Sequence, residues 1–248
     1  MRCIGIIPAR YSSTRLKAKV LADIHGKPMI QHVWERAKKS RLLDDLIIAG
    51  DHELIIQTAK GFGAKAVLTS VDHPSGSDRI AEAVQSLDVD VVINIQGDEP
   101  MINPQIIDDL AGAMINDLHC VMSTVIRLLE RETDLIDPNI VKVTIDQNKN
   151  ALYFSRSAIP YNRDKINFDR VGYYKHLGIY AYRKKFLLTF IRLPKSHLEK
   201  IEQLEQLRVL EAGYKIKTIL TDIPTMSVDT ADDLQRVKEF LKEDGKYR

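Results

Sequence analysis

Cysteine is scarce in this chain, and long apolar runs are absent from it. Cys3 and Cys120 are the only cysteines among 248 residues, and each falls inside an apolar run that we expect to be a buried strand. Two isolated thiols match neither a disulfide framework nor a zinc site, so we expect a reducing compartment. No stretch approaches the roughly 18 consecutive apolar residues of a membrane-spanning helix. The segment MRCIGIIPARYSS also lacks the apolar core of a signal peptide, and we expect a soluble, cytoplasmic protein.

An excess of charge of one sign is also missing. The 36 basic and 34 acidic residues give a formal net charge of +2, with no long basic tract, so nucleic acid is not an expected partner. Neither a Walker A pattern nor GxGxxG follows the first apolar run, which removes the diagnostic feature of P-loop ATPases and dinucleotide dehydrogenases. What the chain does contain is 44% apolar residues, enough for one large domain with a substantial core.

The first half of the sequence alternates apolar runs with amphipathic stretches. We expect strands at 3–9, 45–50, 65–70 and 89–96, and helices at 28–39, 52–62, 78–87 and 104–116. Uninterrupted Ile/Val runs are typical of parallel strands that helices cover on both faces. The pattern therefore predicts an α/β, doubly wound fold.

The second half loses this rhythm. Two strands at 141–146 and 151–156 flank the polar segment 147–150, which predicts a hairpin that begins an insertion. We then expect a strand at 173–183, a helix at 198–211 ending at Gly213, a strand at 215–221 and a helix starting at Thr230.

A basic loop follows the first predicted strand. It contains Arg10, Arg15, Lys17 and Lys19. Because ligands bind at the carboxyl ends of strands in α/β sheets, these side chains are candidates for a phosphate cradle. A solvated surface loop is the alternative interpretation.

Two acidic segments are candidates for a metal site. Asp98 lies in NIQGDEPMI at the end of a predicted buried strand, and Asp229 lies in SVDTADDL between a strand and a helix. Each segment alone could be a simple turn or a helix cap. Together they supply the hard oxygen ligands that a divalent cation bridging to phosphate requires.

Eight segments in order resemble the 3-deoxy-manno-octulosonate cytidylyltransferase family over nearly the whole chain. They are ARYSSTRL, GKPMIQHVWERA, DHPSGSDRIAEA, NIQGDEPMI, ALYFSRSAIP, YKHLGIYAYR, LEQLRVLEAG and SVDTADDL. The resemblance implies a nucleotide-diphospho-sugar-transferase Rossmann-like fold, with a mostly parallel sheet covered on both faces. It also implies a single domain, 1–248, with an inserted sugar-binding and dimerisation region at about 139–200, and a homodimer.

The activity that the resemblance implies is Mg-dependent transfer of a cytidylyl group from CTP to 3-deoxy-D-manno-octulosonate (Kdo), for lipopolysaccharide biosynthesis. Matching positions imply a nucleotide site of Arg10, Arg15, Lys19, Ser75, Gly76 and Arg79. They imply Asp98 and Asp229 as magnesium ligands, and Lys19 with these two aspartates as the catalytic set. The implied sugar pocket consists of Gln96, Arg156, His176, Tyr180, Glu205 and Gln206.

Several alternatives stay open at this point. Arg156 could be a surface strand residue, His176 an interior histidine, and Glu205 with Gln206 the wet face of a helix. The general base could be Asp229 through water, or no side chain at all. An 8-amino analogue of Kdo and a non-catalytic nucleotide-sugar sensor are alternatives for the function.

The chain also departs from the family it resembles. Lys17, Ala18, Lys19 and Val20 stand where the family usually has Pro-Gly-Lys-Pro. If position 18 needs a positive φ, alanine there is strained, and the missing prolines leave the unbound loop more freedom to lose when CTP binds.

Overall fold

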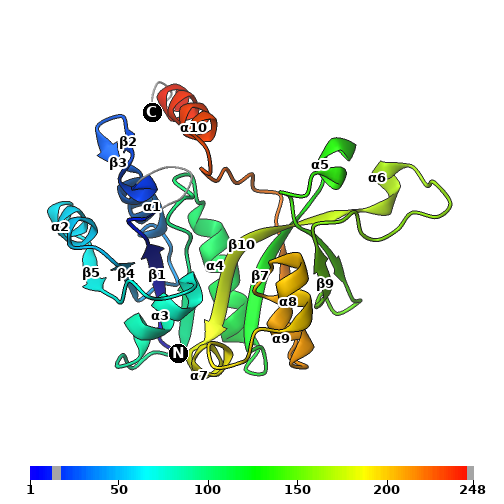
Figure 1. The fold of residues 1–248 in the computed structure, drawn as a ribbon, viewed down its shortest axis with the longest axis horizontal. Coiled ribbons are helices and arrows are strands. Elements are labelled where there is room, and N and C mark those ends of the chain that lie inside the picture. The colour runs from blue at the N-terminus through cyan, green and yellow to red at the C-terminus, as the bar shows by residue number, and fades with distance from the viewer. Residues whose placement is uncertain (13–17, 245–248) are drawn as a thin grey trace.

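The computed structural model describes residues 1–12 and 18–244. A twisted sheet forms its centre, with the path β11-β7-β10-β6-β1-β4-β5 (Figure 1). Four of the six neighbouring pairs along this path are parallel, and β10 is antiparallel to both of its neighbours. The strands are β1 (Cys3–Ala9), β4 (Asp45–Gly50), β5 (Lys65–Leu68), β6 (Val91–Asn94), β7 (Met122–Leu128), β10 (Tyr174–Arg183) and β11 (Lys217–Leu220).

Helices cover both faces of the sheet because side chains of each strand alternate between two cores. In β1, Cys3 and Ile7 face the core under α1 (Met29–Ala37), α2 (Glu53–Gly61) and α4 (Pro104–Asn116). Ile4 and Ile6 face the opposite core, under α3 (Gly76–Val84), α7 (Lys184–Phe190) and α9 (Leu207–Glu211). The predicted α/β fold with a mostly parallel sheet and helices on both faces is confirmed.

A hairpin extends the sheet beyond the end of β10. It consists of β8 (Lys142–Ile145) and β9 (Ala151–Ser155), and β8 pairs with Tyr174 and Lys175 of β10. This hairpin, α5 (Glu132–Ile136) and α6 (Phe168–Val171) form the part that projects to the right in Figure 1. The region 139–200 also contains β10, which lies inside the central sheet.

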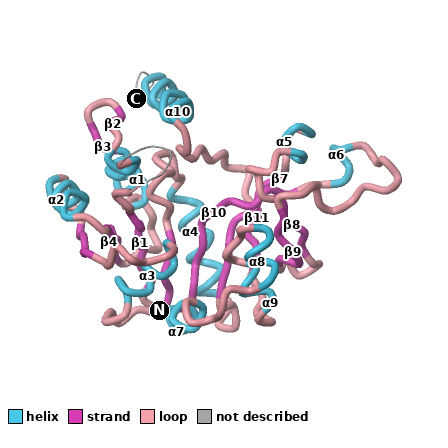
Figure 2. The backbone as a smooth tube through the Cα atoms, viewed as in Figure 1, coloured by secondary structure: helices cyan, strands magenta, loops and turns pink. Residues whose placement is uncertain are grey.

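The C-terminal segment runs from one half of the molecule to the other. After β11 the chain passes along the upper edge of the sheet to α10 (Ala231–Asp244), which lies near β2 (Asp23–Ile24) and β3 (Lys27–Pro28) (Figure 2). Val228 and Val237 are fully buried with Ile24 and Met29 in a small separate core. This packing fixes the position of Asp229, between Val228 and the helix.

Most of the predicted elements are present, and the hairpin and the Thr230 helix start are confirmed. The prediction of a single helix at 198–211 is wrong. This segment forms two helices, α8 (His197–Glu202) and α9, and the chain is interrupted at Gln203, which has a left-handed φ of 54°. The apolar run around Cys120 becomes a strand only at Met122. The small hairpin β2–β3 and the short helices α5, α6 and α7 had not been predicted. Among the described residues, none of the helices combines the length and the apolar character of a membrane span.

Candidate active site

A cavity of about 370 Å³ opens where β1 and β6 end. Its walls come from three segments that are distant in sequence: the basic loop, the start of α3 and the acidic loop after β6. The lining residues are Pro8, Arg10, Ser12, Lys19, Val20, Gly76, Gln96, Gly97 and Asp98. The structure therefore brings five of the predicted site residues to one cavity.

Lys19 lies between the two predicted metal ligands. Its Nζ donates to Asp98 Oδ2 at 2.6 Å and to Asp229 Oδ1 at 3.2 Å. The backbone N–H of Val228 donates to the Asp98 carbonyl at 2.9 Å, which ties the C-terminal segment to the acidic loop. Burial lowers the pKa of Lys19, but the two carboxylates outweigh it, so the pKa lies above its ordinary value. The ammonium is therefore charged at neutral pH.

The carboxylate pair fits Mg²⁺ in chemistry. A cation already sits between the two carboxylates in the form of the Lys19 ammonium. Across the described residues, no cluster of three or more His, Cys, Asp or Glu side chains forms a complete metal cage. Mg²⁺ typically takes one or two carboxylates and completes its shell with waters and substrate phosphates, which matches this pair.

Two glycines border the cavity for different reasons. A Cβ on Gly97 would lie 2.9 Å from the carbonyl oxygen of Pro8, so only glycine lets the acidic loop approach β1 this closely. Gly76 is the first residue of α3, after the N-cap Ser75, whose Oγ accepts from the Asp78 N–H. Backbone N–H groups at such a helix start suit an anionic phosphate.

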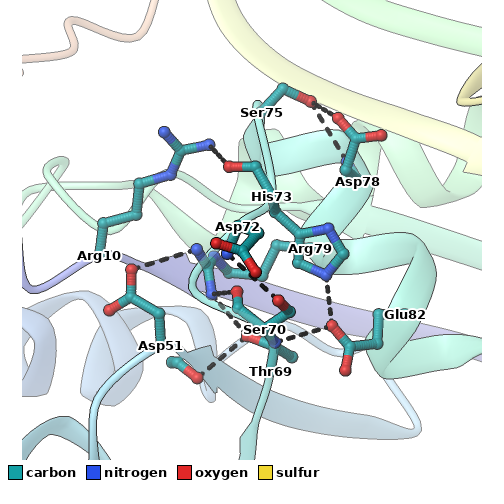
Figure 3. Close-up of polar contacts among 11 residues, drawn as sticks. Arg10, Asp51, Thr69, Ser70, Asp72, His73, Ser75, Asp78, Arg79 and Glu82 are labelled. Carbon is teal, nitrogen blue, oxygen red and sulfur yellow. Dashed lines mark hydrogen bonds and ion pairs between the residues drawn. The ribbon is translucent and has the colours of Figure 1, made fainter.

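Arg79 extends toward Asp51, Thr69 and Ser70 (Figure 3). Its side chain is fully buried and donates to Thr69 Oγ1 at 2.6 Å, to the Ser70 carbonyl at 3.1 Å and to Asp51 Oδ2 at 3.1 Å. Asp51 also accepts from the backbone N–H of Tyr11 at 2.8 Å. Arg79 thus joins the loop after β5 to the basic loop, and it does not line the cavity.

Arg10, in contrast, does line the cavity. Its Nη2 donates to the carbonyl of His73, which belongs to the loop that Arg79 orders. Arg15 lies outside the described residues, as does Lys17 of the basic loop.

Three predicted sugar-pocket residues lie near β10, the strand between β6 and β7. Gln96 Nε2 donates to the Gly178 carbonyl at 2.9 Å. His176 Nε2 is 2.9 Å from Thr124 Oγ1, and its ring centroid is 5.3 Å from that of Tyr180. Desolvation lowers the pKa of His176 to about 3 and raises the pKa of Tyr180, so both rings are neutral at physiological pH.

Glu205 and Gln206 lie between α8 and α9, on the face of the sheet that α3 covers. Glu205 Oε2 accepts from Ser77 Oγ at 2.8 Å, which links it to α3. Gln206 is buried, and its Nε2 has no partner among the described residues. The sequence analysis had not identified Ser77.

Arg156 lies at the corner where β9 ends. Its Nε donates to the Glu202 carbonyl and its Nη1 to the Pro138 carbonyl, each at 2.9 Å. Phe154, two residues earlier in the chain, packs edge-on against His176 with ring centroids 4.9 Å apart, which connects this corner to another predicted sugar-pocket residue. Lys142 and Glu202, which surround Arg156, had also been missed, because nothing in their sequence context distinguishes them from exposed charges.

The sheet topology and a cavity with basic, acidic and helix-start walls define a nucleotidyltransferase. Comparison with known proteins agrees, because the family profile described as cytidylyltransferase matches residues 4–219. The chain is 49% identical over 248 residues to the 3-deoxy-manno-octulosonate cytidylyltransferase of Syntrophobacter fumaroxidans, covering 99% of each chain. It is 45% identical to the enzyme of the same name from Geotalea daltonii, covering 99% of this chain and 100% of the relative.

A solved structure agrees as well. CMP:2-keto-3-deoxy-manno-octonic acid synthetase complexed with CTP superposes with a TM-score of 0.94 at 40% identity, covering 98% of this chain and 100% of that one. The chain belongs to the 3-deoxy-manno-octulosonate cytidylyltransferase family.

Proposed function

We propose that this protein transfers the cytidylyl group of CTP to Kdo, giving CMP-Kdo and pyrophosphate for lipopolysaccharide biosynthesis. The observation that carries the proposal is the meeting of Lys19, Asp98 and Asp229 beside the cavity at the strand ends. Full-length similarity to relatives that bear this enzyme's name supports it.

The chemistry is direct transfer, with the sugar's anomeric hydroxyl attacking the α-phosphorus in line and pyrophosphate leaving. The charged Lys19 and Arg10 hold the triphosphate from the basic loop, and the Gly76 end of α3 adds backbone donors. Mg²⁺ held by Asp98 and Asp229 would supply neutralisation of charge on the phosphate oxygens. Positioning and electrostatics thus provide the catalysis, and no covalent enzyme intermediate is needed.

The proton of the attacking hydroxyl needs an acceptor. His176 is a poor one at neutral pH, because desolvation lowers its pKa to about 3. Asp229 is the better candidate, since its carboxylate is half exposed and lies beside the cavity. We therefore assign the proton-accepting role to Asp229, directly or through one water.

The sugar lies next to the nucleotide, against the neutral face formed by Gln96, His176 and Tyr180. Arg156 offers a planar fork to the sugar carboxylate, and Glu205 accepts from sugar hydroxyls. The homodimer and the cytoplasmic location stay predictions; light scattering after gel filtration tests the first.

The decisive experiment measures pyrophosphate release on mixing CTP, Mg²⁺ and Kdo, with the 8-amino analogue of Kdo as a parallel substrate. Asp98→Asn and Asp229→Asn should each lower turnover at least a hundredfold while circular dichroism stays unchanged. Asp222→Asn, an exposed position on the same C-terminal segment, is the matched control. Near-normal turnover of both folded site variants would contradict the proposed metal site, and no release by the unmodified protein would contradict the function.

A further inference from the structure

A lysine bonded to backbone carbonyls lies in the interior of the projecting part. Lys142, the first residue of β8, is fully buried. Its ammonium donates to three backbone carbonyls, those of Asp137 at 2.8 Å, Ile140 at 2.6 Å and Arg156 at 2.6 Å. An ammonium has three donors, so all of them are used.

Burying an ammonium in this way is costly, because desolvation lowers its pKa and the charges of Asp137 and Glu202 offset this only in part. A methionine or leucine of similar volume would fill the same space without that cost. The three carbonyls come from two separate segments, 137–140 and the end of β9. The lysine therefore holds these two segments together, and it does so by binding the backbone of Arg156.

Arg156 is held from the other side by a second charged residue. Glu202, the last residue of α8, accepts from the Arg156 backbone N–H at Oε2, at 2.9 Å. Its Oε1 accepts from Ser155 Oγ at 2.6 Å, and its carbonyl accepts from Arg156 Nε. Both backbone polar groups of Arg156 are thus bonded to buried or half-buried charged side chains.

Two backbone carbonyls, those of Glu202 and Pro138, fix the direction of the guanidinium. Nε donates to Glu202 and Nη1 to Pro138, whereas Nη2 donates to no residue that the structure describes. The adjoining residue Val141 accepts from the backbone N–H of His176 at 2.8 Å. Segment 141–142 therefore connects the arginine corner to the sugar-pocket histidine.

We propose that Lys142 and Glu202 are positioning residues that hold Arg156 with its remaining donors toward the carboxylate of the acidic sugar. This inference rests on the proposed function, in which Arg156 binds that carboxylate. Loss of either side chain frees one backbone group of Arg156, so the backbone shifts and carries the guanidinium away from the sugar. The nucleotide side of the cavity, built from other segments, keeps its geometry. The affinity for Kdo then falls and the affinity for CTP does not.

The test compares Lys142→Met and Glu202→Gln with Arg156→Ala and with the two double variants that combine each with Arg156→Ala. Each single variant should raise the KM for Kdo about tenfold or more, with the Kd for CTP by calorimetry within twofold of the unmodified protein and kcat reduced less than KM is raised. In the Arg156→Ala background, neither second substitution should change the KM further, because both act through Arg156. Lys184→Met is the matched control, since Lys184 also donates to two backbone carbonyls, those of Gln85 and Leu87, away from the sugar pocket.

Each outcome decides a different statement. Unchanged KM in both single variants, equal damage to CTP and Kdo, or a further rise in the Arg156→Ala background would overturn the inference. If Lys142→Met does not fold, the measurements on Glu202→Gln, alone and combined with Arg156→Ala, decide the inference. If Arg156→Ala leaves the KM for Kdo unchanged while the unmodified protein turns over, the inference and the proposed role of Arg156 both fail, and the proposed reaction stands. Absence of turnover in the unmodified protein is instead a failure of the proposed function.

Discussion

Replacing Lys19 by methionine tests the charge balance between this side chain and two aspartates. In the free protein, its ammonium neutralises Asp98 and Asp229, whose carboxylates converge on one point. Methionine keeps most of the length and the apolar stem but removes the charge. The variant should therefore be less stable than the unmodified protein, and it should bind a divalent cation more readily in the absence of nucleotide.

The size of the effect follows from the exposure of the partners. Lys19 and Asp98 are 14% and 27% exposed and 2.6 Å apart, so their charged hydrogen bond contributes about 1.5–3 kcal/mol. Asp229 is 52% exposed and 3.2 Å away, and that contact contributes only about 0–1 kcal/mol. The combined loss of about 1.5–4 kcal/mol corresponds to a fall in Tm of roughly 3–16 °C for a chain of this size.

Thermal unfolding with and without millimolar Mg²⁺ measures both expectations. The Tm of the unmodified protein should change little on adding Mg²⁺ alone, whereas that of Lys19→Met should rise, because the cation takes the place of the ammonium. Lys27→Met removes an exposed ion pair with Glu35 and is the matched control. An unchanged Tm in Lys19→Met, or a variant that ignores Mg²⁺, would show that Lys19 does not neutralise the carboxylate pair.

Three further predictions concern the backbone of the cavity and the sugar pocket. Ala18 has a left-handed φ of 50°, so Ala18→Gly should relieve about 1–2 kcal/mol of strain at an entropic cost of about 0.5–1 kcal/mol. The variant should be slightly more stable and should bind CTP more tightly, as measured by calorimetry. Weaker CTP binding would refute this prediction. Gly97→Ala should lower both Tm and nucleotide affinity, because its Cβ would lie 2.9 Å from the Pro8 carbonyl; a crystal structure with an unshifted loop would contradict it. Burial lowers the pKa of His176 to about 3, so the unfolded chain binds a proton below about pH 6.5 that the folded protein does not. The free energy of unfolding should therefore fall as pH drops from about 6.5 to 3. In His176→Gln, the slope of this free energy against pH, measured by urea unfolding, should be smaller by up to about 1.4 kcal/mol per pH unit.

Strands and long helices were predictable where burial alone determines them. The run 45–50 is apolar on both sides because helices cover both faces of β4, and α4 has an Asn103 cap and a proline at its first position. The break at Gln203 was not predictable, because the apolar spacing of 198–211 continues across it. A capping box at Ser196 starts α8, and the left-handed Gln203 ends it after one and a half turns, which lets α9 turn to pack Leu207 into the core.

The residues in the loops at the strand ends were predictable as members of one site, since residues that follow parallel strands meet at one edge of the sheet. Asp98 lies 79 residues after Lys19 in the chain and Asp229 lies 210 residues after it, yet all three residues lie at that edge. Arg79 belongs to the same motif as Ser75 and Gly76, and the motif does not reveal which way its side chain turns. A helix places Ser75 and Gly76 at its open end and, one turn later, directs Arg79 toward Asp51 and the loop after β5.

Residues that hold the site follow a different logic from residues that touch the substrate. A lysine in a strand normally lies in water, so Lys142 carries no signal in the sequence. Its burial becomes possible only because a helix C-cap, a loop and a strand end place three carbonyls around one point. Those carbonyls lie 2, 5 and 14 residues from Lys142, so the site forms only when the hairpin and α5 pack together. Recognition of the acidic sugar should therefore depend on the folding of the projecting part, whereas the binding of CTP depends on the strand ends of the central sheet.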